Sequence, residues 1–129
     1  MTILALLTGA VLFGGMVFYS FGFAPVLFAQ LPMDRVRPLL RGTFPYYYLA
    51  VIGLSAVAAG LALLVSHLAA ALFATIFLST IYARQDLMAR INAATDRGDK
   101  AAFNWLHGAS VALQLVQIGV AGWALVLLA

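Results

Sequence analysis

Long apolar runs constrain this chain more than any other feature of its sequence. Four runs, at residues 3–29, 44–65, 68–83 and 104–128, approach the roughly 20 residues that cross a bilayer, and the third continues as a helical pattern to about residue 95. Only 9% of the residues are charged and 65% are hydrophobic, which identifies an integral membrane protein. Because backbone polar groups in lipid must be satisfied internally, we expect an all-α membrane protein, a single domain of four transmembrane helices.

The boundary between the second and third runs is marked only by Ser66 and His67. One helix over residues 44–83 would be about 60 Å long, roughly twice the thickness of the hydrocarbon core. The sequence therefore predicts a tight turn near residues 65–69, and four spans instead of three.

The basic residues test the number of spans independently. All seven lie in two segments: Arg35, Arg37 and Arg41 after the first run, and Arg84, Arg90, Arg97 and Lys100 after the third. The positive-inside rule puts both segments on the cytoplasmic side of the membrane. We therefore expect an antiparallel bundle in a bacterial inner membrane, with two cytoplasmic loops and both termini on the outer, periplasmic side.

Two other interpretations of the composition have less support. A cleaved signal peptide needs a basic first region and a small-residue cleavage site, and the apolar N-terminus has neither. Nucleic-acid binding would explain the net charge of +3, but four Asp residues lie among the basic ones, which suits anionic lipid headgroups better. The absence of Cys excludes thiolate metal sites. We expect membrane lipid around the chain and no nucleic-acid partner.

Local signals predict where the helices bend and end. Pro25 removes a backbone donor and predicts a kink in the first helix. Thr43 is suited to cap the second helix, with Pro45 in its first turn. Residues 96–98 predict a break after the third helix, and Asp99 a cap for the fourth.

Small residues form two candidate helix-packing surfaces. They are Ala10, Gly14, Gly15 and Gly22 in the first span, and Gly53, Ala56 and Gly60 in the second. Small side chains let transmembrane helices approach closely and gain van der Waals contact. Such surfaces serve either inside the bundle or against another protein.

Polar side chains follow one side of the fourth span. At about 100° per residue they fall within one arc or just beside it: Asn104, His107, Ser110, Gln114 and Gln117. The third helix has a matching polar face, formed by Thr75, Ser79, Tyr82 and Asp86. Buried polar groups in a bilayer need internal partners or a wet cavity. The two faces therefore predict either interhelical hydrogen bonds or a polar groove that opens to the cytoplasm near His107.

Aromatic residues indicate the lipid-facing surface and the membrane edges. Trp105 and Trp123 lie opposite the polar stripe and about 27 Å apart along the helix. The consecutive residues Tyr46, Tyr47 and Tyr48 are expected at headgroup level. We treat these five residues as lipid-interface anchors.

Haem and metal ions are the cofactors that a small membrane bundle most readily suggests. His67 is expected at the outer end of the bundle and His107 near the cytoplasmic end, so they cannot share one ligand. Binding of haem through a single His remains as an alternative. No serine–histidine–carboxylate set, metal-binding cluster or phosphate-binding loop occurs, so we predict no cofactor, no catalytic residue and no enzymatic activity.

Three sequence elements resemble the transmembrane protein 205-like family. They are GGMVFYSFGFAPVLFAQLP, LLRGTFPYYY and the F-x-x-L-H-x-x-S run at residues 103–110. The positions that match are Gly14, Gly15, Pro25, Pro32, Pro45, His107 and Ser110. The resemblance implies a small four-helix membrane protein and hints at export or trafficking; where this chain has Gln114 the family commonly has Asn. In size and topology the chain more distantly resembles copper-resistance and haem-linked protoporphyrinogen oxidase membrane proteins.

Three functional hypotheses follow from these patterns. The first is a structural or accessory membrane subunit, or a self-associating one, that acts through helix packing with a membrane protein partner or a second copy. The second is a protein that handles a small solute, drug or metal ion through the polar groove. The third is a single-His haem-binding protein.

Overall fold

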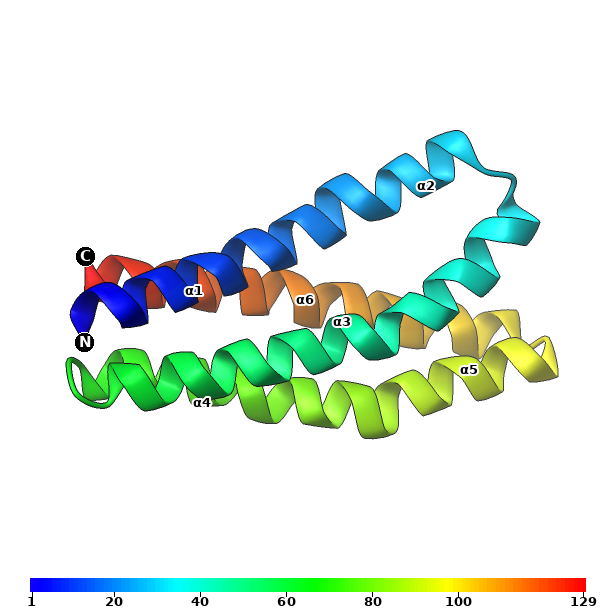
Figure 1. Ribbon diagram of the computed structural model, residues 1–129. Helices are drawn as coiled ribbons and strands as arrows, with labels where there is room; N and C mark the ends of the chain where they lie inside the picture. Colours follow the sequence, from blue (N-terminus) through cyan, green and yellow to red (C-terminus); the bar gives the residue numbers. More distant parts are fainter.

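The computed structural model describes all 129 residues as four helical rods joined by three short turns (Figure 1). The first rod consists of α1 (Thr2–Val17), the π-helix η1 (Phe18–Phe23) and α2 (Ala24–Gln30), and the second is α3 (Met33–Ala62). The third consists of α4 (His67–Tyr82), the π-helix η2 (Ala83–Leu87) and α5 (Met88–Arg97), and the fourth is α6 (Lys100–Leu128). Each rod is long and apolar enough to cross a membrane, which confirms the all-α prediction with four spans.

The chain turns back at each connection, so that both termini lie at one end of the bundle (Figure 1). We call the half nearest the termini the terminal half (residues 2–16, 51–80 and 117–128). The other half, which contains η1, η2, α2 and α5, is called the splayed half (residues 17–50 and 81–116).

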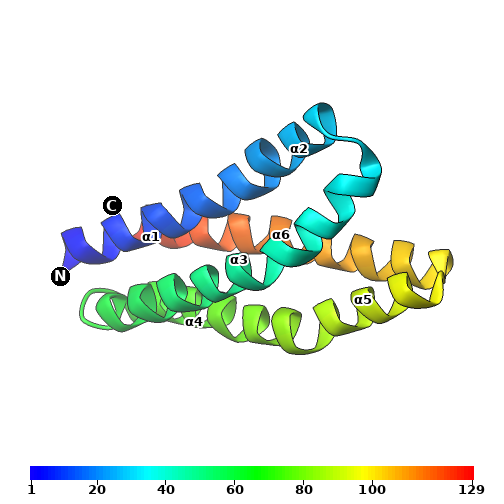
Figure 2. The same cartoon turned by 45° about the vertical axis from the view of Figure 1, so that its right-hand side comes forward.

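The second rod begins earlier than the sequence suggests. Pro32 has an extended backbone and α3 starts directly after it, at Met33, with Pro45 well inside the helix. The prediction that Thr43 caps this helix is therefore wrong, because the preceding residues are already helical; its hydroxyl donates back to a carbonyl of the same helix. A proline inside a helix removes one hydrogen bond and favours curvature, and α3 curves along its length (Figure 2).

The other two turns lie near their predicted positions, although α5 continues through Arg97, two residues beyond the predicted end. Ser66 adopts an extended conformation, and its hydroxyl oxygen accepts a hydrogen bond from the backbone N–H of Ala69 at 3.2 Å. At the opposite end of the bundle, Gly98 has a φ of +68°, a left-handed conformation that glycine adopts without strain. Asp99 then caps α6 by accepting from the N–H of Ala102 at 3.1 Å.

The first rod is irregular on the N-terminal side of Pro25. The N–H of Ala24 bonds to the carbonyl of Tyr19, five residues back, which defines the wide turns of η1. Pro25 lies in the first turn of α2, and because η1 runs into α2 without a break, its missing N–H falls inside a continuous helical rod. The distortion thus occupies residues 18–23, the turn directly N-terminal to the proline, where a proline ring disturbs a helix.

The terminal half contains the main core of the bundle. Phe73 lies fully buried among Leu12, Met16 and Ile76. Around them pack small core residues from three rods: Ala58, Ala62, Ala69, Ala70, Ala121 and Ala124. Small side chains allow these helices to approach closely.

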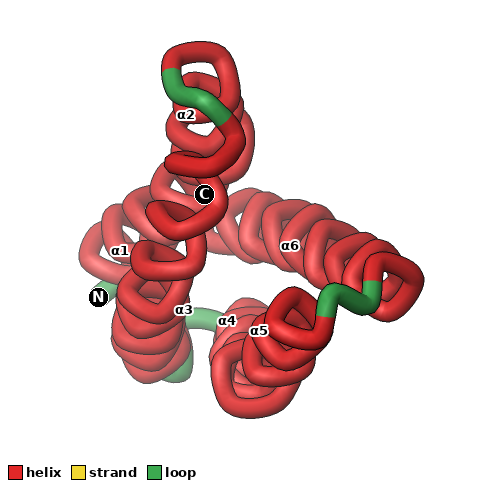
Figure 3. Tube along the Cα trace, turned by 90° about the vertical axis from the view of Figure 1, so that its right-hand side faces the viewer, coloured by secondary structure: helices red, strands yellow, loops and turns green.

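The splayed half is more open. The main contacts of α2 are with η1 and α3, and the end view shows α2 standing apart from α5 and α6 (Figure 3). A second, smaller core joins Tyr48 to Ala83 and Leu87 of η2. At the rim, Arg41 of α3 makes an exposed bidentate ion pair with Asp96 of α5, with N–O distances of 2.8 and 3.1 Å.

Candidate functional site

The polar contact between α4 and α6 is centred on Gln117. Its amide nitrogen donates to the hydroxyl oxygens of Ser79 at 2.8 Å and of Thr80 at 2.9 Å. Gln117 is 4% exposed and Thr80 is fully buried. The two hydroxyls in turn donate to the carbonyl of Ile76, one turn earlier in α4. This cluster is satisfied within the protein and holds two helices together.

The remaining members of the predicted polar groove divide between the interior and the surface. Ser110 is buried and Gln114 half-buried, whereas Asn104 and His107 are exposed. His107 stacks on the neighbouring ring of Phe103, with ring centroids 5.5 Å apart. The structure therefore does not bring the whole fourth-span stripe together.

The third-helix face divides in the same way. Thr75 is exposed and donates to the carbonyl of Ala71 in its own helix. Tyr82 is exposed, and Asp86 forms an i,i+4 ion pair with Arg90 at 3.1 Å. Of the four predicted residues, only Ser79 contacts the polar side of α6.

A second polar cluster lies in the splayed half, between η1, α3 and α6. The hydroxyls of Tyr48 and Ser110 are 3.4 Å apart, and the hydroxyl of Ser20 donates to Oε1 of Gln114 at 3.4 Å. The other amide atom of Gln114, Nε2, is buried without a partner. Incomplete pairing distinguishes this cluster from the one around Gln117.

The three consecutive tyrosines do not share one environment. Tyr46 is 75% exposed and can act as the predicted interface anchor. Tyr47 is half-buried, and Tyr48 is only 4% exposed. Successive helical residues are about 100° apart, so three neighbours cannot all face the lipid.

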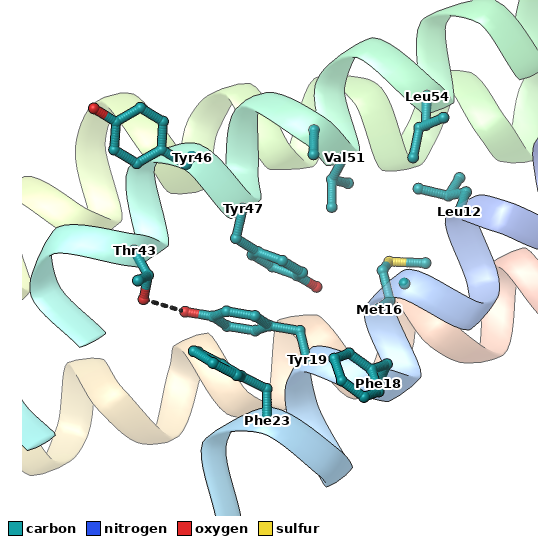
Figure 4. Close-up of a pocket in the computed structure, with 12 residues that line it drawn as sticks. Leu12, Met16, Phe18, Tyr19, Phe23, Thr43, Tyr46, Tyr47, Val51 and Leu54 are labelled. Atoms are coloured by element: carbon teal, nitrogen blue, oxygen red, sulfur yellow. Dashed lines mark hydrogen bonds between the residues drawn. The ribbon is translucent and has the colours of Figure 1, made fainter. Parts of the chain in front are cut away.

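Tyr47 belongs to an aromatic stack that crosses between the first two rods (Figure 4). Its ring lies 4.1 Å from the ring of Tyr19, which stacks in turn on Phe23 at 5.5 Å. The Tyr19 hydroxyl is 3.0 Å from the hydroxyl of Thr43. The Tyr47 hydroxyl is buried and has no hydrogen-bond partner.

Next to this stack is a hollow of about 430 Å³ between α1, η1 and α3. We call it the tyrosine hollow. It is lined by Leu12, Gly15, Met16, Phe18, Tyr19, Phe23, Thr43, Tyr46, Tyr47, Ala50, Val51 and Leu54. No lining residue is charged, so the hollow suits apolar or neutral groups.

The glycines fall into two classes by the space around them. A Cβ added at Gly9 would lie 2.8 Å from Cζ of Phe73 and 3.0 Å from Cδ2 of Leu125, so this glycine allows close packing inside the bundle. The predicted packing positions differ. At Gly14, Gly15, Gly53 and Gly60 an added Cβ would meet nothing within 4 Å. Ala10 and Ala56 are exposed, and the nearest atoms to Gly22 belong to Phe18 of the same helix.

The tryptophans and histidines occupy the positions along the rods that the sequence suggests. Trp105 and Trp123 are 76% and 52% exposed, as expected for side chains that face lipid. His67 is the first residue of α4, beside the turn at the terminal end, and His107 lies in the splayed half. No cluster of three or more His, Cys, Asp or Glu side chains is placed to hold a metal ion.

Sequence patterns missed residues whose partners are distant in the chain. Tyr19, Ser20 and Thr43 contribute to the splayed-half clusters across 24 or 94 residues of sequence. Thr80 is next to Ser79 but about 100° away on a helical wheel, so it falls outside the predicted face. The only local signal for Thr80 in the sequence is that it directly follows Ser79.

Comparison with known proteins identifies a family. No curated protein and no solved structure matches the chain. Residues 7–100, more than half of the chain, match the family model described as a domain of unknown function, DUF4149. The four apolar rods thus belong to a multi-pass membrane protein of the DUF4149 family.

Proposed function

We propose that this protein is a membrane subunit that acts through helix packing, and that it associates with a second copy of itself through the outer face of α3. The observation that carries the proposal is the open space outside Gly53 and Gly60. With Ala56 between them, these residues follow one exposed side of the helix at spacings of three and four. Small residues on an outward face allow another transmembrane helix to approach.

The contrast with Gly9 supports an intermolecular role. Gly9 is surrounded by side chains of its own bundle, whereas Gly53 and Gly60 are not. Next to Gly60 there is also a hollow of about 270 Å³ between α3 and α4, in which a side chain from a neighbouring helix would fit. Its lining is mostly small: Ala59, Gly60, Leu63, His67, Ala70, Ala71 and Ala74.

The proposal includes an orientation in the membrane. The seven basic residues lie in the α2–α3 and α4–α6 regions, away from the termini. The positive-inside rule then favours an antiparallel bundle in a bacterial inner membrane with both termini in the periplasm. Accessibility of tags added at the two termini, measured in intact cells, tests this orientation.

Handling of a small solute is the second hypothesis, and the resemblance to the transmembrane protein 205-like family is what favours it. Its groove would run between α4 and α6. The hydrogen bonds of Gln117 to Ser79 and Thr80 favour a packing role for those residues instead. The haem hypothesis predicts a Soret band in protein purified from haem-replete cells, and its absence would leave that hypothesis without support.

Association through α3 can be tested by disulfide crosslinking, because the chain has no Cys of its own. Val57 is 53% exposed and lies on the proposed face. We expect Val57→Cys to form a disulfide-linked dimer in oxidised native membranes. Adding Gly53→Leu should abolish the dimer, since the larger side chain prevents close approach of the second helix.

Gly119→Leu is the matched control. Gly119 of α6 is also exposed, also has no atom within 4 Å of an added Cβ, and lies one turn from Trp123. The Val57→Cys dimer should persist in this background. An equal dimer yield with Gly53→Leu, or no dimer from Val57→Cys alone, contradicts association through α3.

A further inference from the structure

The tyrosine hollow combines features that a purely structural gap does not need. Five of its twelve lining residues are aromatic and none is charged. Three residues at its edge, Gly15, Phe18 and Tyr46, are exposed, so the hollow opens on the outer surface of an apolar rod pair. Its volume of about 430 Å³ falls within the range of sites that bind small organic ligands.

The inner wall of the hollow holds a polar group that lacks a partner. The Tyr47 hydroxyl is buried, and it is directed away from Thr43 and towards Met16 (Figure 4). Ser20, whose own hydroxyl donates to Gln114, lies near it, but no hydrogen bond joins the Tyr47 and Ser20 hydroxyls. A buried hydroxyl without a partner is unfavourable in an apolar surrounding. The Tyr47 hydroxyl therefore has a hydrogen that an oxygen acceptor from outside the chain could accept.

The local backbone also departs from regular geometry at this point. The π-helix η1 supplies Tyr19 and Phe23 of the stack, and η2 packs against Tyr48 at the same level of the bundle. Single π-helical turns occur frequently at functional sites. The aromatic lining, the free hydroxyl and the two π-helices thus coincide in the splayed half.

We propose that the tyrosine hollow binds a neutral, ring-bearing lipid with a carbonyl oxygen, of the membrane quinone class. The planar ring would pack against the exposed edge of the aromatic stack. Its carbonyl oxygen would accept a hydrogen bond from Tyr47 once the flexible side chain of Met16 moves aside. The isoprenoid tail would leave the hollow along the outer surface of α1 and α3.

The chemistry of the lining favours this ligand over the other occupants of a membrane. A phospholipid headgroup carries phosphate, and the lining offers no Lys or Arg to balance it. A bare acyl chain would fill the apolar space but would leave the Tyr47 hydroxyl unpaired. A quinone satisfies both the aromatic walls and the free donor.

The test is isothermal titration calorimetry, in which ubiquinone-1 is added to the purified protein in detergent micelles. The same titration into protein-free micelles is the blank. We expect saturable binding to the wild type. Tyr47→Phe keeps the stacked ring and should weaken binding about tenfold, the loss that accompanies one buried hydrogen bond. Tyr82→Phe is the matched control, because it makes the same chemical change at an exposed residue of α4 that does not line the hollow, and it should bind as the wild type does.

Three results would overturn the proposal. They are a lack of saturable binding, equal affinities for wild type and Tyr47→Phe, and displacement of the quinone by an equal concentration of 1-dodecanol, which has a chain but no ring. Helicity of each variant, measured by circular dichroism, confirms that the bundle is intact. Gly53→Leu should bind the quinone normally, so this proposal and association through α3 can fail separately.

Discussion

The terminal and splayed halves of the bundle are built by different means. In the terminal half, alanines and Gly9 bring the helices close around Phe73, and the amide nitrogen of Gln117 donates to two hydroxyls. In the splayed half, tyrosines and phenylalanines separate the rods, and the Tyr47 hydroxyl and the Gln114 amide nitrogen remain unpaired. The same four rods therefore provide a closely packed anchor at one end and an incompletely satisfied, more open region at the other.

This difference shows where each kind of function can reside. Close packing stabilises the fold, and the hollow that lies wholly in the terminal half, beside Gly60, is lined mostly by small apolar side chains and suits a side chain of a partner helix. The tyrosine hollow lies where the two halves meet, and its aromatic side, with the unpaired Tyr47 hydroxyl, belongs to the splayed half. The lower packing density of the splayed half also allows side chains to move at smaller cost.

The largest effect is expected from Gly9→Leu in the terminal half. An added Cβ already comes within 2.8 Å of Phe73, and the rest of a leucine has no space. Overpacking of a core typically costs 1–3 kcal/mol, and we expect a loss of about 3 kcal/mol in the free energy of unfolding. Titration with a denaturing detergent, followed by circular dichroism, measures it.

Gly119→Leu controls for the better helix propensity of leucine, because its surroundings are open. It should leave the free energy of unfolding unchanged or slightly higher. If Gly9→Leu is tolerated as well as Gly119→Leu, the terminal half is not closely packed around Phe73, and the distinction between the halves is lost.

Glycine illustrates what the sequence can and cannot predict. The sequence pattern selects Gly14 and omits Gly9, but it is Gly9 that allows close packing inside the bundle, and the two glycines look alike in a sequence. Which glycine faces a neighbour depends on the rotation of each helix within the bundle, and that is set by all four rods together. The same limit applies to Tyr47 and Tyr48, which turn inward because the register of α3 rotates them there.

Helix ends were the most predictable part of the fold. Ser66, Gly98 and Asp99 act on backbone groups within three residues, so their roles are visible in the sequence. The prediction for Thr43 was wrong because an N-cap stands at the start of a helix. The chain is already helical from Met33, so Thr43 lies inside α3. The candidate site depends on pairs such as Ser20 with Gln114, which only the assembled bundle brings together.

A pair of glutamine variants tests the comparison within one helix. Gln117→Ala removes two interhelical hydrogen bonds, whose loss in a membrane protein typically costs about 0.6–1.7 kcal/mol each. Ser79 and Thr80 keep their bonds to Ile76, so no new unpaired hydroxyl arises. We expect about 1–2 kcal/mol of destabilisation in the same detergent titration.

Gln114→Ala removes one long hydrogen bond, with Ser20 at 3.4 Å, together with an amide nitrogen that has no partner. Its effect on the free energy of unfolding should therefore be smaller than that of Gln117→Ala. Equal or larger destabilisation by Gln114→Ala would show that the splayed half is as fully satisfied as the terminal half.

The smallest effect is expected at the turn that closes the splayed half. The pKa of the Asp99 carboxyl lies below its ordinary value of 3.8, because the N–H of Ala102 donates to it and Arg97 lies 3.4 Å away. A carboxyl whose pKa is lower in the folded state stabilises the fold at a pH above its unfolded pKa, and this contribution is lost as the pH falls through the folded pKa.

Asp99→Asn keeps a capping oxygen and removes the charge. We therefore expect a thermal midpoint slightly below that of the wild type at about pH 7, and a difference that shrinks progressively as the pH falls below 3.8. A difference that stays constant with pH would mean that the charge of Asp99 contributes nothing and that this turn depends on the neutral cap alone.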